Sequence, residues 1–305
     1  MTSPAANTRD RILGCLLGGA IGDALGHSFE GSGPIEVVTD TRLWSLSDDT
    51  QLTLATCEGI IEAGGRIDPE VIAGRFAAWH RAQRVTGMGS STLKALAELV
   101  QGGHWALVGR RGEMAAGNGA AMRSAPLAFF LNVDDAEDPF TRRTLRDVCR
   151  ITHHNDEAYA GALAIVSAVR AAWTGAWTGD ATLLRLVKDR LPDTNVRDRI
   201  QEMAQVERDL SLRELAARFG CSGWVVETVP LALCAAQRVR SLGFEAMLRE
   251  LVGAGGDADT LASMAGQVAG TLLGPSGLPA AWLARLPERA LIEQTAAALA
   301  RWVLS

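Results

Sequence analysis

Apolar residues recur every three or four positions through most of the chain, which is the spacing of helices with one buried face. The pattern and its capping signals predict helices over residues 11–25 (capped by Thr8 or Asp10), 48–63, 93–100, 158–173, 261–273 and 288–304. Two further helices are predicted: one begins at Asp68-Pro69, and the other runs from Pro230 to Arg240. No segment alternates apolar and polar residues over the length of a strand, and no internal repeat is found. We therefore expect an all-α fold in a single compact domain over residues 1–305, with residues 1–8 as a flexible tail and the charged segment 180–218 as an exposed subregion.

The first predicted helix is unusual because glycines surround its one acidic residue, Asp23. These glycines are Gly18, Gly19, Gly22 and Gly26. Each glycine inside a helix costs about 1 kcal/mol relative to alanine, so the cluster favours close backbone packing or contact with a ligand. Asp23 and the following Glu30 have two interpretations: they are surface caps, or they are carboxylates near an acidic site.

Two short acidic loops precede helices far apart in the sequence: Ser47-Asp48-Asp49-Thr50 and Gly255-Gly256-Asp257-Ala258-Asp259-Thr260. Taken alone, the second loop is most simply a helix N-cap, because a carboxylate there suits the backbone N–H groups and the helix dipole. Carboxylate and hydroxyl oxygens are also ligands for hard cations such as Mg²⁺ or Mn²⁺, and two such loops folded together can hold two ions. Neither loop has a cysteine or histidine at metal-ligand spacing, which disfavours zinc.

Composition narrows the class of protein. The chain has 305 residues, 48% of them hydrophobic, so it can bury a sizeable core. Its net charge is −5, and it has no basic tract of the kind that follows a nucleic-acid backbone. Five scattered cysteines without a CxxC pair predict reduced thiols, and the first residues lack the features of a signal peptide, so we expect a cytoplasmic protein. The longest apolar stretch, residues 158–169, is too short to span a bilayer, and we expect no membrane partner.

Three polar segments carry weaker signals. Gly117-Asn118-Gly119 stands near a helix start, where backbone N–H groups hold phosphate oxygens, although an Asn-Gly turn explains the same residues. Gly87-Met88-Gly89 is most simply a turn. His153 follows Thr152 just before a helix, where a histidine is usually a cap or a surface residue.

Taken together and in their order along the chain, five of these motifs resemble those of the ADP-ribosylglycohydrolase family, which includes the dinitrogenase reductase-activating glycohydrolases. The matching segments are Gly22-Asp23-Ala24-Leu25-Gly26 with Glu30, residues 47–50, Gly117-Asn118-Gly119 with Met122-Arg123, Thr152-His153 and residues 255–260, between about Arg11 and Gly274. The resemblance implies an all-α fold with two Mg²⁺ or Mn²⁺ ions in a cleft. It also implies hydrolysis of the bond between C1″ of ADP-ribose and an acceptor, an ADP-ribosylated protein being the first expectation, while a nucleic-acid acceptor and the oligomeric state stay open.

The resemblance further implies roles for individual residues. The metal ligands would be Ser47, Asp48, Asp49, Asp257, Asp259 and Thr260. The catalytic residues would be Glu30, Asp48 and Asp259, with Glu30 as ligand, gate or proton carrier. The substrate-binding residues would be Gly87, Gly89, Gly117, Asn118, Gly119, Met122, His153 and Trp224, the last at an aromatic position that can stack on adenine.

Two positions depart from the family pattern. Ser47 replaces the usual threonine, which keeps the hydroxyl oxygen and loosens the rotamer. Gly87 stands where arginine-specific members resemble Asp-x-Gly-x-Thr, and that aspartate can pair with the acceptor guanidinium. The Gly-x-Gly form is more similar to members acting on serine-linked or O-acetyl-ADP-ribose, so we expect an oxygen-linked acceptor. Arginine specificity is the alternative, with Glu113 or an acidic residue of 31–40 in place of the missing aspartate.

Other classes of protein fit less well. Asp257-x-Asp259 is similar to the nucleophile motif of aspartyl-phosphate phosphatases, but that motif follows a strand near the start of the chain. An EF-hand fails because Val268 stands where a glutamate is needed. A non-catalytic ADP-ribose-binding or crystallin-like protein is the main non-enzyme alternative. Loss of a metal carboxylate would favour it, and none is missing here.

Overall fold

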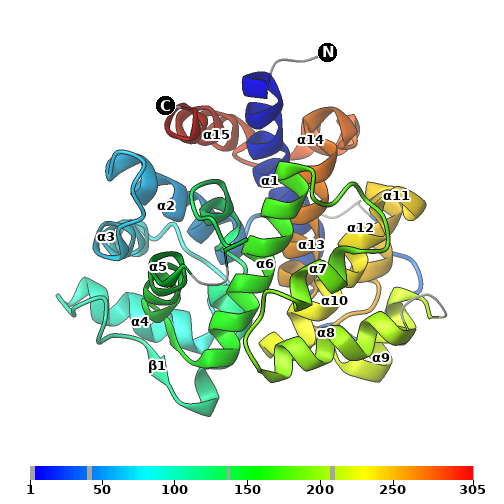
Figure 1. Cartoon of the computed structure of the whole chain (residues 1–305), viewed down its shortest axis with the longest axis horizontal. Helices are drawn as coiled ribbons and strands as arrows, with labels where there is room; N and C mark the ends of the chain where they lie inside the picture. The colour runs from blue at the N-terminus through cyan, green and yellow to red at the C-terminus, as the bar shows by residue number, and fades with distance from the viewer. Residues whose placement is uncertain (1–3, 40–42, 136–137, 207–209, 305) are drawn as a thin grey trace.

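Helices make up nearly all of the regular structure (Figure 1). The computed structural model describes residues 4–39, 43–135, 138–206 and 210–304. The α-helices are α1 (Pro4–Gly26), α2 (Asp48–Glu62), α3 (Pro69–Arg81), α4 (Ser90–Val100), α5 (Pro139–Arg150), α6 (Asp156–Thr174), α7 (Leu183–Lys188), α8 (Asn195–Val206), α9 (Leu212–Phe219), α10 (Val225–Gln237), α11 (Val239–Leu242), α12 (Phe244–Val252), α13 (Ala258–Leu273), α14 (Ala280–Arg285) and α15 (Arg289–Val303). The 3₁₀ turns are η1 (His27–Phe29), η2 (Glu113–Ala115), η3 (Asn118–Ala120), η4 (Ala125–Phe129) and η5 (Pro275–Gly277). Two short parallel strands, β1 (Arg110–Arg111) and β2 (His153–His154), are the only sheet in the described part of the chain, so the all-α prediction is confirmed.

Helices α1 and α13 pack side by side near the centre of the molecule (Figure 1). Their backbones are so close that a Cβ atom added to Gly18 would lie 2.3 Å from the carbonyl oxygen of Gly266, and one added to Gly22 would lie 2.0 Å from that of Ala262. Close packing, one of the two predicted explanations, therefore accounts for these glycines. Because the two helices are antiparallel, the C-terminal end of α1 lies beside the N-terminal end of α13.

Helices α6 and α10 pack against α13 and complete the central core. Nearly every residue of α6 between Ala158 and Ala172 is buried, and so is nearly every residue of α10. Pro230 lies inside α10, so this helix begins earlier than predicted. One hydrophobic cluster connects residues from α1 through to α15.

The structure corrects the predicted chain start and the predicted exposed subregion. Helix α1 begins at Pro4, so residues 4–8 are helical and not a tail, and Thr8 and Asp10 lie inside the helix, where they cannot cap it. The segment 180–218 folds into α7, α8 and α9, whose apolar faces are buried, and α8 packs on α10. None of the charged residues described in this segment is fully buried, so they face solvent around packed helices.

One helical stretch in the described part of the chain passes the length and composition test for a membrane span. Residues Asn7–Phe29, which contain most of α1 and all of η1, are long and apolar enough to cross a membrane by length and composition, and they lie near the N-terminus. In this structure 83% of the qualifying window is buried inside the protein. That burial is what a central core helix shows.

Candidate active site

The buried carboxylate of Asp23, near the end of α1, holds the first acidic loop in place. It accepts hydrogen bonds from the backbone N–H and hydroxyl of Ser47 (3.1 and 2.8 Å) and from the backbone N–H and hydroxyl of Thr50 (3.1 and 2.6 Å). These bonds satisfy N–H groups at the start of α2, whose N-cap residue is Ser47. Asp23 is therefore not a surface cap, because it fixes the position of the loop that carries Asp48 and Asp49.

Asp257 occupies the N-cap position of α13, yet its side chain makes no capping hydrogen bond. The side-chain amide of Asn118 instead donates to Asp257 Oδ2 at 2.6 Å and to the hydroxyl of Thr228 at 3.2 Å. Asn118 thus connects the glycine loop and α10 to the second acidic loop. The simple N-cap interpretation is wrong for Asp257, whose carboxylate faces other side chains.

The two acidic loops meet through Asp49 and Thr260. The hydroxyl of Thr260 donates to Asp49 Oδ2 at 3.0 Å, and the hydroxyl of Ser47 lies 3.1 Å from the same oxygen. The second oxygen, Asp49 Oδ1, is buried and has no hydrogen-bond partner among the described residues. A buried carboxylate oxygen without a partner is costly, so a cation ligand role fits this atom.

Burial and mutual repulsion raise the pKa values of the clustered carboxyl groups. Burial, followed by the charge of Asp259, raises the pKa of Asp257 to about 7. Burial raises the pKa of Asp23 to about 6, and burial with neighbouring carboxylates raises the pKa of Asp48 and of Asp49 well above the usual range. A divalent cation would relieve this repulsion, and an all-oxygen set of carboxylates and hydroxyls suits Mg²⁺ or Mn²⁺.

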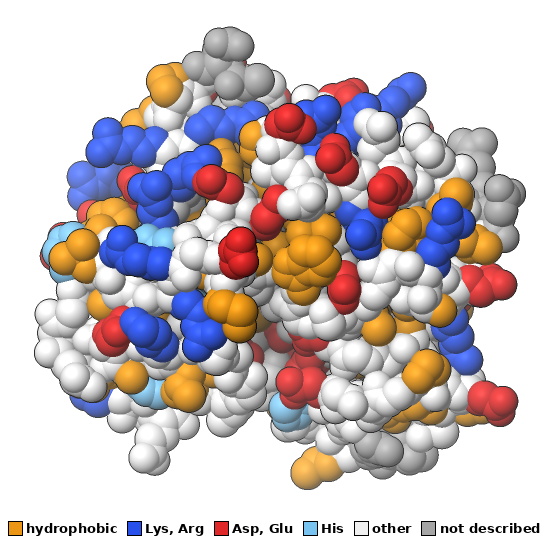
Figure 2. Space-filling view, turned by 90° about the horizontal axis from the view of Figure 1, so that it is seen from below, with side chains coloured by type: hydrophobic (Ala, Val, Ile, Leu, Met, Phe, Trp, Pro, Cys, Tyr) orange, Lys and Arg blue, Asp and Glu red, His pale blue; other side chains and the backbone are white. Residues whose placement is uncertain are grey.

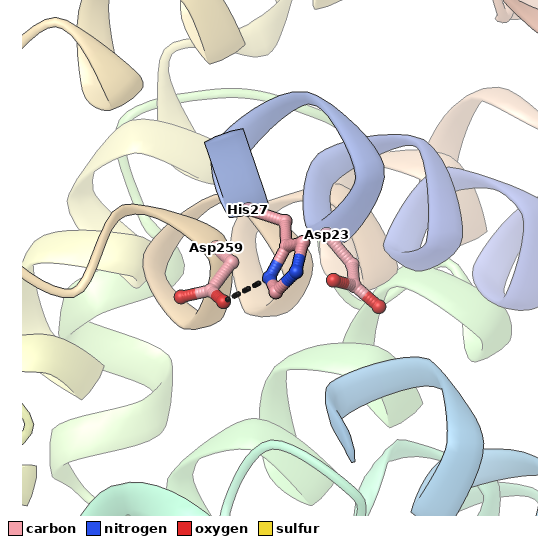
Figure 3. Close-up of side chains that lie close together, drawn as sticks. All are labelled: Asp23, His27 and Asp259. Carbon is pink, nitrogen blue, oxygen red and sulfur yellow. Dashed lines mark hydrogen bonds and ion pairs between the residues drawn. The ribbon is translucent and has the colours of Figure 1, made fainter. Parts of the chain in front are cut away.

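His27, the first residue of η1, adds an imidazole to the cluster (Figure 3). Its Nδ1 lies 3.4 Å from Asp259 Oδ2, and ligand atoms of Asp23, His27 and Asp259 lie within 4.8 Å of one another. A second group of this kind joins Glu30 and Asp257 to Asp259. Hydrogen bonding to Asp259 raises the pKa of His27. His27 was not among the predicted site residues, although it stands four positions after Asp23 and so shares its helix face.

The two acidic loops line a cavity of about 500 Å³. This volume is typical of small-molecule sites. Figure 2 shows acidic side chains gathered in a hollow of one face. The predicted site residues that line the cavity are Glu30, Asp48, Asp49, Gly87, Gly89, Gly117, Asn118, Gly119, Met122, His153, Asp257, Asp259 and Thr260. Two predicted residues do not line it: Ser47 is fully buried, and the side chain of Trp224 is 42% exposed at the surface. Trp224 follows Gly223, which lines the cavity, and its backbone pairs with that of Gly117, so its stacking role stays a prediction.

The remaining wall consists of residues that were not predicted. They are Gly31, Ser90, Ser91, Thr92, Met114, Ser222, Gly223 and Gly256. Most are small or hydroxylated residues with no signal of their own, although several adjoin the predicted glycines along the chain.

His153 packs its ring against the glycine loop. A Cβ atom on Gly117 would lie 3.2 Å from His153 Nε2, and one on Gly119 would lie 2.9 Å from Cε1, so the loop needs glycine to admit the ring. His153 is buried in β2 and is neither a cap nor a surface residue. Burial, reinforced by the charge of Arg123, lowers the pKa of His153 to about 3. The ring is therefore neutral at physiological pH.

The fold and site define a helical protein in which buried carboxylate and hydroxyl oxygens, suited to a hard cation, adjoin a cavity for a small polar ligand. The chain belongs to the ADP-ribosylglycohydrolase family, whose model matches residues 4–304, and it is a glycosyl-bond hydrolase of that family.

Named relatives and a solved structure agree with this assignment. The chain is 30% identical to ADP-ribosylarginine hydrolase Tri1 of Pseudomonas putida (strain GB-1), over 91% of this chain and 74% of that protein. It is 27% identical to ADP-ribosyl-[dinitrogen reductase] glycohydrolase of Rhodospirillum rubrum, over 98% of both chains. A solved structure described as an ADP-ribosylglycohydrolase-related protein complex matches with a TM-score of 0.73 and 29% identity, covering 98% of this chain and 99% of its own.

Proposed function

We propose that this enzyme uses two Mg²⁺ or Mn²⁺ ions to hydrolyse the bond between C1″ of ADP-ribose and an oxygen-linked acceptor. The substrate would be a cytoplasmic ADP-ribosylated protein or a small ADP-ribose conjugate. The ions would be held by Ser47, Asp48, Asp49, Asp257, Asp259 and Thr260.

The unpartnered Asp49 Oδ1 carries the metal part of the proposal. It belongs to a cluster of buried carboxylates, none of which forms an ion pair with a lysine or arginine among the residues that the structure describes. The histidine His27 lies beside Asp259 of this cluster. The cluster therefore carries more negative charge than its own surroundings balance. Divalent ions bound there would supply positive charge that orients the ribose hydroxyls and lowers the pKa of water.

The residues of the chain contribute binding and proton transfer. Cleavage of a glycosyl bond builds positive charge at C1″, which nearby carboxylates stabilise. Glu30 lines the cavity with a half-exposed side chain, and burial together with the charge of Asp259 raises its pKa. Glu30 therefore holds a proton more readily than an ordinary glutamate, and in the proposed reaction it would exchange that proton with water or with the departing acceptor.

Gly87 bears on the choice of acceptor because it lies beside the acidic loops. A Cβ atom there would be 3.3 Å from Ser47 Cβ, 3.6 Å from Asp48 Oδ1 and 3.9 Å from His27 Cε1. A side chain at this position would thus reach the region of the reacting bond, and glycine offers it no charge. A hydrogen-bonded guanidinium gains roughly 1.5–3 kcal/mol from a charged partner, so its loss disfavours an arginine acceptor by about ten- to a hundredfold.

The test compares wild type, Gly87→Asp and Gly87→Asn on arginine-linked and serine-linked ADP-ribose at one Mg²⁺ concentration. The φ of Gly87 is +80°, so both variants bear the same backbone strain, and the difference between them isolates the charge. We expect wild type to prefer the serine linkage, and Gly87→Asp to exceed Gly87→Asn on the arginine linkage by about tenfold. Rapid wild-type cleavage of the arginine linkage, with the serine linkage intact, would refute the acceptor proposal. Full activity in chelator would refute the metal proposal.

Arginine-linked ADP-ribose is the second candidate. Glu30 lines the same cavity and offers a carboxylate, and the Pseudomonas putida relative is named an ADP-ribosylarginine hydrolase. The other carboxylates suggested for pairing with an arginine acceptor give this candidate less support. Glu113 lines a neighbouring cavity, Glu36 lines neither, and Asp40 lies outside the described residues.

A further inference from the structure

Arg123 is a fully buried cation to which the proposed reaction gives no role. One nitrogen, Nη2, donates to the carbonyl oxygen of Val148 at 3.2 Å and to the hydroxyl of Thr152 at 2.9 Å. The guanidinium carbon lies 4.7 Å from the ring centre of Phe76. Arg123 forms no ion pair with a described residue, and its Nε and Nη1 have no hydrogen-bond partner there. Burying a cation without an ion pair and with unpartnered nitrogens is costly. The polar contacts that Arg123 does make therefore point to its role.

The contact with Thr152 determines the direction of a short hydrogen-bond chain. Arginine has donors only, so the hydroxyl oxygen of Thr152 accepts from Arg123. Besides Arg123, the partner of this buried hydroxyl in the described part of the chain is His153 Nδ1, at 2.7 Å. The hydroxyl proton therefore points to Nδ1, which must present a lone pair. In a neutral imidazole the ring proton then lies on Nε2.

The edge of the ring that carries Nε2 faces the glycine loop. His153 lines the cavity, and the positions that Cβ atoms of Gly117 and Gly119 would occupy lie 3.2 and 3.4 Å from Nε2. No hydrogen bond from Nε2 to a described residue is found. An N–H group there suits an oxygen acceptor of a bound ligand.

We propose that Arg123 and Thr152 are positioning residues that hold His153 as the Nε2–H tautomer, which donates a hydrogen bond to an oxygen of ADP-ribose at the glycine loop. The identity of the ligand rests on the proposed function, whereas the tautomer does not. The arrangement makes the buried ring a donor without protonating it. It also explains the buried guanidinium. Because Arg123 can only donate, the hydroxyl of Thr152 cannot direct its proton to Arg123 and directs it to Nδ1 of His153.

Nitrogen-15 NMR of the histidine rings in the wild-type protein tests the tautomer directly. The chain has five histidines, and His153→Gln assigns the His153 signals while His154→Gln controls for the adjacent ring. We expect an unprotonated Nδ1 and a protonated Nε2, unchanged across neutral pH. A protonated Nδ1 in the wild-type protein would overturn the proposal.

Calorimetric titration with ADP-ribose and with Mg²⁺ tests whether the hydrogen bonds from Arg123 through Thr152 to His153 support ligand binding. Thr152→Val removes the hydroxyl at nearly constant shape, and Thr152→Ser keeps it. We expect Thr152→Val to weaken ADP-ribose binding about three- to tenfold, the worth of one hydrogen bond, with Mg²⁺ affinity unchanged and Thr152→Ser close to wild type.

The remaining outcomes separate this inference from the proposed function. Equal weakening in the serine and valine variants would show a packing effect and overturn the inference, as would wild-type affinity in Thr152→Val. Failure of the wild-type protein to bind ADP-ribose at all would refute the proposed function, while the nitrogen-15 spectrum would still decide the tautomer.

Discussion

Replacing Gly18 with alanine tests whether the close contact of α1 with α13 builds the site. The added Cβ atom would lie 2.3 Å from the carbonyl oxygen of Gly266, whereas real Cβ atoms essentially never come within 3.0 Å of such a neighbour. The backbones must therefore part by about 0.7 Å or more, the difference between these two distances. Neither side can yield locally, because both contacts belong to the backbone of buried helices.

Overpacking of this kind costs typically 1–3 kcal/mol, and the better helix propensity of alanine returns about 1 kcal/mol. We expect the free energy of unfolding to fall by up to about 2 kcal/mol, which for a chain of this length lowers Tm by up to about 3 °C. Asp23 and Asp259 lie at the adjoining ends of the two helices, so their separation should grow and Mg²⁺ should bind more weakly.

Gly74→Ala is the matched control, because Gly74 lies in α3 and a Cβ atom added there meets nothing within 4 Å. We expect this variant to gain about 1 kcal/mol from helix propensity alone. Scanning calorimetry in chelator measures the stability of both variants, and isothermal titration measures Mg²⁺ binding. If Gly18→Ala matched Gly74→Ala in stability and bound Mg²⁺ normally, the role assigned to the α1–α13 contact would be refuted.

Three further predictions concern the site. Asp257→Asn should abolish most Mg²⁺ binding by titration calorimetry while leaving the circular dichroism spectrum unchanged, because the side chain lies outside the apolar helix faces; normal Mg²⁺ affinity would contradict its ligand role. In chelator, wild-type stability should fall as pH rises from about 4 to about 7, because the folded pKa of Asp257, about 7, exceeds its ordinary value of 3.8, so that the folded state holds the proton that the unfolded chain has released. Asp257→Asn should flatten that dependence in thermal melts, and an unchanged slope would assign it to other groups. Trp224→Ala should weaken ADP-ribose binding and leave Mg²⁺ binding unchanged, because Trp224 is exposed and adjoins the cavity-lining residues Gly223 and Gly117; unchanged ADP-ribose affinity would contradict its predicted stacking role.

Much of the helical structure follows from local pattern. The Asp68-Pro69 signal begins α3 as predicted, with the Asp68 side chain accepting hydrogen bonds from Glu70 and Val71. Local pattern predicted helix boundaries wrongly where tertiary packing overrides local propensity. Helix α10 continues through Pro230, where propensity alone predicts a break, because nearly all of its residues are buried in the core. Residues 4–8 extend α1 ahead of its predicted start.

The sequence by itself determined which residue types are available to the site, because carboxylates, hydroxyls and glycines in short loops can be recognised without knowing their neighbours. Tertiary structure decided how they are used. The contact between α1 and α13 places Asp23 and His27 beside Asp259, and Asn118 reaches Asp257 across a long stretch of chain. The same applies to His153, whose burial and whose link through Thr152 to Arg123 depend on segments that meet only in the folded chain. Burial, the pKa of a carboxyl group and the tautomer of an imidazole all depend on neighbours distant in sequence, so no local pattern could have specified them.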